Sequence, residues 1–217
     1  MLHQQRQKLK TKRMCWNRES SLITGTTSVA LSSFLLWRNR GNDVPIALIS
    51  LAVALMQFAE AFMWEGITAE EPEKGTLGGK LGITALFLQP LILGTACLYF
   101  GGFGLLATGL FAVLGLLVSA PLYRKMMQKE WRPPATVGCN GHLEWLFTAD
   151  IRGTAFGVFY WITMLGAWLL LTPRSEGAFY AIIAAVSVFL TIQFYPGEWG
   201  SMWCFLANLL PACRLFL

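Results

Sequence analysis

Charged residues are scarce in this chain of 217 residues: they make up 13% of it, whereas a soluble domain typically carries about 25%. Hydrophobic residues make up 55%, and the mean hydropathy is +0.51. No charge occurs in four long runs, at 20–37, 81–123, 153–173 and 177–197. Such runs are typical of membrane-spanning helices, because about 20 residues cross a hydrocarbon core of about 30 Å. The composition therefore excludes a soluble globule, a disordered chain and a nucleic-acid-binding domain.

Residues that several membrane chemistries need are also missing. The only histidines are His3 and His142, both outside the apolar runs, which excludes a haem held by paired intramembrane histidines. No lysine follows Lys129, which excludes a retinal bound as a Schiff base to a lysine of a later span. No arginine ladder for voltage sensing occurs either. The five cysteines are odd in number and form no CxxC pair, so no disulfide framework is expected. We predict no cofactor.

The apolar segments that are present predict an all-α, polytopic membrane protein, a bundle of seven transmembrane helices. The expected spans are 20–37, 44–64, 81–100, 103–123, 153–172, 177–195 and 198–217. The glycine-rich sequence at 101–104 divides an uncharged run that is too long for one crossing. The last span is the least regular, because it contains Pro211 and Arg214. Residues 20–217 are thus expected to form one domain, preceded by a basic arm at 1–19.

The distribution of basic residues indicates an orientation. With alternating crossings, thirteen of the 17 lysines and arginines fall on the N-terminal side, and Arg38, Arg40, Arg174 and Arg214 fall on the other. Cytoplasmic loops carry the excess of basic residues, so we expect a cytoplasmic N-terminus and an external C-terminus. The sequence leaves open whether the membrane is that of the cell or of an organelle. We expect the basic arm to contact anionic lipid and no nucleic acid.

Polar residues within the spans predict a polar cavity, because most of them lie in the same half of the membrane. The candidate lining residues are Gln57, Glu60, Gln89, Gln193, Ser201, Cys204 and Asn208. Alternating crossings place most of them in the cytoplasmic halves of their spans, with Gln89 and Asn208 near mid-depth. A carboxyl group within a span is costly unless it is paired, protonated or facing a cavity, so Glu60 is the leading candidate. The alternative is that Glu60 forms an ion pair with Arg152.

The longest connection, 124–152, holds the only candidate metal ligands, Cys139 and His142. Their spacing of three would suit half of a zinc site, but the sequence has no second pair, so no metal site is predicted. Apolar residues near position 145 are expected to lay this loop along the membrane interface. Four tryptophans are interpreted as interfacial anchors, namely Trp64, Trp145, Trp199 and Trp203.

Three short sequence segments resemble those of a family of membrane proteins. They are Met56-Gln57-Phe58-Ala59-Glu60-Ala61-Phe62-Met63-Trp64, Gln89-Pro90 and Gly200-Ser201-Met202-Trp203-Cys204. With these strings and the layout of most of its length, the chain resembles an uncharacterised family of small seven-helix integral membrane proteins. The resemblance implies the seven-helix architecture and singles out Gln57, Glu60, Gln89, Ser201 and Cys204. It transfers no reaction.

Two hypotheses of function follow from the sequence. The first is a small channel or carrier for an ion, a proton or a small polar solute, with Glu60 as the titrating or cation-binding group. The second is a non-catalytic structural or assembly subunit of a larger membrane complex or homo-oligomer. A membrane-embedded enzyme using Cys204 or the Cys139–His142 loop is a further alternative, although we expect no enzymatic activity.

Overall fold

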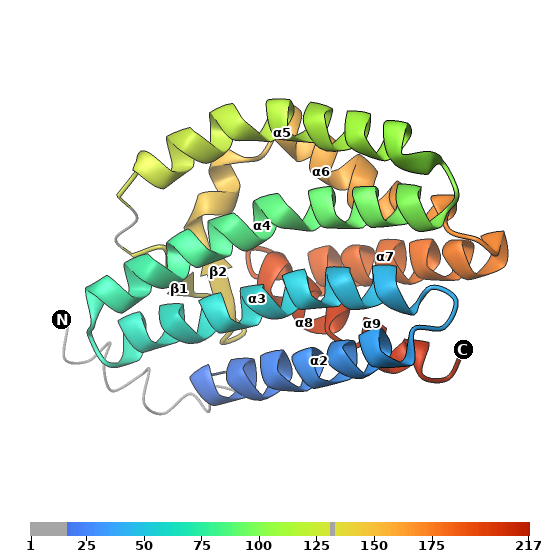
Figure 1. Cartoon of the computed structure of the whole chain (residues 1–217). Coiled ribbons are helices and arrows are strands. Elements are labelled where there is room, and N and C mark those ends of the chain that lie inside the picture. The colour runs from blue at the N-terminus through green and yellow to red at the C-terminus, as the bar shows by residue number, and fades with distance from the viewer. Residues whose placement is uncertain (1–16, 131–132) are drawn as a thin grey trace.

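The computed structural model describes residues 17–130 and 133–217, and it is almost entirely helical (Figure 1). The helices are α2 (Arg18–Arg38), α3 (Asp43–Thr68), α4 (Pro72–Phe100), α5 (Gly104–Gln128), α6 (Ala155–Gly166), α7 (Arg174–Phe194), α8 (Trp199–Ala207) and α9 (Leu210–Arg214). Strands β1 (Ala135–Val137) and β2 (Leu143–Trp145) form an antiparallel hairpin, and the 3-10 helices are η1 (Leu146–Asp150) and η2 (Ala167–Leu170). The all-α expectation is confirmed. The basic arm lies outside the described residues, except for its last three positions.

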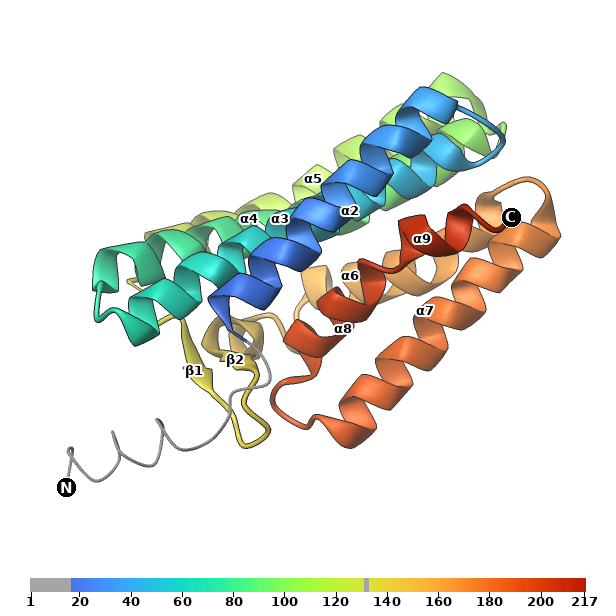
Figure 2. The same cartoon turned by 90° about the horizontal axis from the view of Figure 1, so that it is seen from below.

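The helices run along one common axis in alternating directions, as Figure 1 shows. Helices α2 to α5 lie side by side in one layer, and α6 to α9 with the hairpin pack against it (Figure 2). One end of the molecule, the hairpin end, gathers the hairpin, the α3–α4 turn and the α7–α8 turn. The opposite end, the C-terminal end, gathers the α2–α3, α4–α5 and α6–α7 connections and the C-terminus.

Four of the described helices, α3, α4, α5 and α7, are long and apolar enough to cross a membrane. In α3 and α4, 72% and 61% of the most apolar window is buried, and these helices form the interior. In α5 only 11% is buried, so that Leu105, Leu106 and Leu117 point outward with exposed fractions of 76%, 78% and 66%. An apolar surface of this extent is typical of contact with a membrane or with another protein. The structure is therefore compatible with a membrane location.

The prediction that the seventh span is a single helix is wrong. Helix α8 ends at Ala207 and α9 begins only at Leu210. Two local features explain the break: the Asn208 side chain donates to the Cys204 carbonyl at 2.7 Å, and Pro211 opens α9 without a backbone N–H. The fifth expected span is also shorter than predicted, because α6 has 12 residues before it tightens into η2.

A buried ion network at the C-terminal end explains where the last segment goes. Arg38 donates to both carboxylate oxygens of Asp43 at 2.7 Å, and Arg214 Nε donates to Asp43 Oδ1 at 2.7 Å. Arg214 also donates to Glu176 at 2.7 Å and to the Arg40 carbonyl at 3.0 Å. The network ties α9 to α2, α3 and α7. This network was not predicted from the sequence, because its members are far apart along the chain.

Candidate functional site

Glu60 is completely buried near the hairpin end of α3, and neither carboxyl oxygen has a hydrogen-bond partner. No lysine, arginine or histidine of the described chain forms an ion pair with it. The expected partner Arg152 is exposed and makes no contact of this kind, so the ion-pair alternative is wrong. The reason is the layer of side chains between them, since Arg152 follows η1 at the surface while Glu60 faces the centre of the bundle.

Three polar groups lie nearest the Glu60 carboxyl: Ser201 of α8, Trp145 of β2 and Gln57 of α3. None of them meets hydrogen-bonding geometry with it, and each of the three also lacks any other partner. A buried polar group left unpaired costs about 1–3 kcal/mol, and native proteins contain few of them. Several such groups in one place are typical of a site that binds a polar partner.

A second set of polar groups adjoins the first. The Tyr160 hydroxyl of α6 donates to Gln89 Oε1 of α4 at 2.8 Å. The Gln89 amide faces the Cys204 thiol, which in turn lies close to Glu60. Helix α4 continues through Pro90 without a break, and this continuity keeps Gln89 directed into the bundle.

We call this assembly the Glu60 cluster, and its members are Gln57, Glu60, Gln89, Trp145, Tyr160, Ser201 and Cys204. Tyr160 and the polar role of Trp145 were not predicted from the sequence, because an aromatic residue gives no sequence signal of a hydrogen bond. Two candidates lie elsewhere. Gln193 is exposed near the end of α7, and Asn208 is buried as the cap of α8.

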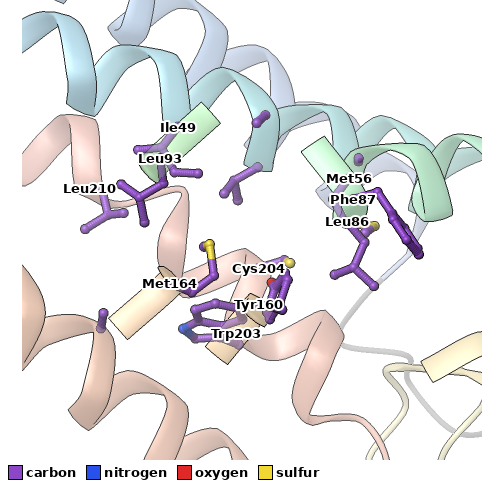
Figure 3. Close-up of a cluster of buried hydrophobic side chains, with 14 of the residues drawn as sticks. Ile49, Met56, Leu86, Phe87, Leu93, Tyr160, Met164, Trp203, Cys204 and Leu210 are labelled. Carbon is purple, nitrogen blue, oxygen red and sulfur yellow. The ribbon is translucent and has the colours of Figure 1, made fainter. Parts of the chain in front are cut away.

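A cavity of about 750 Å³ lies beside the Glu60 cluster. Trp145, Tyr160 and Cys204 belong both to the cluster and to the cavity wall. Figure 3 shows Cys204 and Tyr160 next to Trp203, the ring contact between Tyr160 and Trp203 having a centroid distance of 6.1 Å. Glu60 itself is thus separated from the cavity by a single layer of side chains. The charged residues on the cavity wall are Glu144 and Arg152, both exposed.

Aromatic rings form one wall of this cavity. The Trp161 ring lies 5.5 Å from that of Trp199 and 5.6 Å from that of Trp203. Trp64, Trp145 and Trp203 are at most 4% exposed, so their interpretation as interfacial anchors is wrong. The hairpin carries Trp145 and α8 carries Trp203 into the interior, whereas Trp64 lies on the buried helix α3.

Glu198 holds the hairpin in place. Its buried carboxylate accepts the backbone N–H groups of Asn140 at 2.8 Å and His142 at 3.2 Å. Burial lowers the pKa of His142, and the charge of Glu198 opposes part of this effect. Because β2 continues from His142 to Trp145, this anchor sets the position of Trp145 over Glu60.

The residues described by the structure contain no group of three or more His, Cys, Asp and Glu side chains placed to hold a metal ion. Of the two candidate ligands, Cys139 is exposed and His142 is buried. Cys97, Cys204 and Cys213 are free thiols.

Comparisons with protein-family models, with curated proteins and with solved structures find no match to this chain. The resemblance to a seven-helix family therefore stays a prediction, and function is argued from the site alone.

Proposed function

We propose that this protein is a multi-pass membrane carrier for a small ion, a proton or a small polar solute, acting through the Glu60 cluster and the adjoining cavity. The observation that carries the proposal is a fully buried carboxyl group without a counter-charge, one side-chain layer from a cavity of about 750 Å³. An ionisable group at membrane depth is expensive and marks a pathway or binding site by default. A purely structural role would favour a paired carboxylate or an apolar residue.

A carrier fits the geometry better than an open channel. Between Glu60 and the C-terminal end, α3 buries apolar side chains that include Ile46, Ile49 and Met56, each fully inaccessible. An ion network around Asp43 joins the helices at that end. In the proposed carrier, passage from the cavity to the C-terminal end requires a change of conformation, as in alternating-access transporters.

The proposal includes seven crossings of the membrane. Helix α2 has 21 residues, a length of about 31 Å at 1.5 Å per residue, which matches the hydrocarbon core. The alternating direction of successive segments supports insertion of α6–η2 and α8–α9 beside the four helices of spanning length.

The test is ion flux into proteoliposomes. Purified protein is reconstituted with an entrapped pH-sensitive dye, and proton uptake is driven by an imposed potassium diffusion potential, with Na⁺ or an organic cation such as choline added as candidate co-substrate. We expect Glu60→Gln to lower the flux at least tenfold. Glu65→Gln is the matched control, since this carboxylate lies on the same helix but pairs with Lys74 at the surface, and it keeps wild-type flux. Equal flux in Glu60→Gln and wild type would remove Glu60 from the mechanism.

The assembly-subunit alternative is favoured by a different observation. An apolar hollow of about 360 Å³ lies between α7 and α8, next to the outward-facing Ile182, which is 63% exposed. A helix of a partner would fill such a surface. Co-purification of a stoichiometric partner in mild detergent, with no flux by the isolated chain, would support this alternative. A monodisperse monomer with its own flux would count against it.

A further inference from the structure

We infer that the cavity beside the Glu60 cluster binds a small organic cation of the ammonium class. The inference rests on the proposed carrier function and names its substrate class. Three features of the cavity carry it: the aromatic wall, the missing counter-charge of Glu60 and the lack of a ligand shell for a metal ion.

The aromatic wall attracts cations. The faces of Trp and Tyr rings carry negative electrostatic potential, and an ammonium group within about 6 Å of a ring centre is held by it, best by Trp. The rings that line the cavity are Trp145, Tyr160, Trp161, Trp199 and Trp203. Tyr160, Trp161, Trp199 and Trp203 contact one another at 5.5 to 6.1 Å and form one continuous surface rather than isolated rings. A methylated or alkylated ammonium can lie flat against such a surface.

The charges around the cavity also favour a cation. Glu144 and Arg152, the charged lining residues, are both exposed to solvent and opposite in sign, so they largely offset each other. The remaining ionisable group is Glu60, beside Trp145 and Cys204, and no described residue forms an ion pair with it. A cation placed nearby would stabilise the ionised form of this carboxyl group, whereas an anionic ligand would oppose its ionisation.

The lining favours an organic cation over a bare metal ion. Alkali and alkaline-earth ions need several oxygen ligands to replace their hydration shell. Most of the cavity lining is instead aromatic or aliphatic carbon, and the described residues include no metal-binding group of carboxylates. The volume of about 750 Å³ lies within the range of about 300–1,000 Å³ that small-molecule pockets occupy.

Cys204 offers a test, because this residue belongs to the cavity wall and lies close to Glu60. In a chain that keeps Cys204 and has its other four cysteines replaced by alanine, modification is followed with methanethiosulfonates that carry trimethylammonium, sulfonate or a neutral methyl group. Rates are normalised to those of a free thiol in solution. We expect the cationic reagent to react at least tenfold faster than the sulfonate, and Glu60→Gln to reduce this ratio severalfold.

The outcomes separate the two proposals. Equal normalised rates for cation and sulfonate would overturn the cation assignment while leaving access to the cavity, and thus the carrier, in place. Failure of every reagent to reach Cys204 would overturn both. A proton flux that depends on Glu60 but shows no cation preference would support the carrier and overturn the cation assignment.

Ligand protection gives an independent measurement on the same protein. Choline and its uncharged isostere 3,3-dimethylbutan-1-ol have the same shape, and each is added during modification by the neutral reagent. We expect choline to slow the modification of Cys204 and the isostere to leave it unchanged. Trp203→Leu should weaken the protection by choline, whereas Trp37→Leu, a tryptophan 79% exposed on α2, should not. Equal protection by the two compounds would contradict a cation site.

Discussion

Asp43 and Glu60 on α3 are both completely buried, but the groups that surround their carboxyl oxygens differ. Asp43 accepts hydrogen bonds from two arginine side chains at 2.7 Å, whereas Glu60 has no cationic partner. Breaking a buried ion pair by removing one member leaves the other charge uncompensated, while replacing an unpaired carboxyl with an amide of the same shape leaves none. At the residue scale, Asp43 is thus a structural charge, whereas Glu60 is the carboxyl group to which we assign a functional role in the proposed carrier.

This contrast has opposite consequences for stability. We expect Asp43→Asn to lower the free energy of unfolding by about 3–5 kcal/mol, because Arg214 and Arg38 lose their counter-charge. Glu60→Gln should leave the stability unchanged or raise it. Thermal unfolding of both variants in the same detergent measures the difference. A Glu60→Gln protein less stable than Asp43→Asn would mean that Glu60 has a structural partner.

His142 should give the protein a pH-dependent stability. Burial lowers its pKa from the ordinary value of about 6.5, so the unfolded chain takes up the proton first as the pH falls. The folded state is therefore favoured most above about pH 6.5 and loses stability between that value and the lower folded-state pKa. We expect the Tm of the wild type to fall more steeply than that of His142→Gln between about pH 7 and pH 5. Parallel curves would show that His142 titrates alike in both states.

Sequence patterns could predict Gln57, Glu60 and Ser201 because a polar residue is conspicuous in an apolar span. They could not predict Tyr160 or Trp145, whose ring composition looks like ordinary apolar packing. The polar ends of these aromatic residues become informative only when the fold brings them against Gln89 and Glu60.

At the scale of elements, the uncharged runs located the helices because a bilayer requires about 20 apolar residues in succession. The ends of the helices could be predicted less well from the sequence. Helix α4 begins at Pro72 and not near Leu81, since a helix continues past the apolar stretch wherever nothing ends it. The position of the hairpin and that of α9 depend on distant partners: Glu198 is 58 residues from Asn140, and Arg214 is 171 residues from Asp43.

The α3–α4 contact beside Glu60 depends on a single glycine. A Cβ at Gly78 would lie 2.7 Å from both the Ala59 carbonyl oxygen and the Met63 amide nitrogen, backbone atoms that cannot move aside cheaply. We expect Gly78→Ala to separate the helices, to destabilise the protein by about 1–3 kcal/mol and to lower flux with it. Gly109→Ala on α5 is the matched control, because nothing lies within 4 Å of its Cβ position. Equal Tm values for the two variants would contradict the close approach.

For the whole molecule, the basic residues are distributed unevenly between the two sides of the predicted crossings. Ion pairs occur at both ends, since Arg38 and Arg214 pair with Asp43 and Glu176, and Lys74 and Lys129 pair with Glu65 and Asp150. With alternating crossings, thirteen of the 17 lysines and arginines fall on the N-terminal side. Because cytoplasmic loops are the more basic, we expect the hairpin end, with the cavity, to face the cytoplasm.

Cysteine labelling tests this orientation and the crossings behind it. Cys139 is exposed at the hairpin end, and Arg40 is exposed at the C-terminal end. In a chain otherwise free of cysteine, we expect a membrane-impermeant maleimide to label Cys139 only in inverted vesicles, and an Arg40→Cys variant lacking Cys139 only in right-side-out vesicles. The reverse pattern would invert the orientation. Because α3, α4 and α5 lie between the two positions, labelling of both from the same side would mean that these three helices do not all cross the membrane.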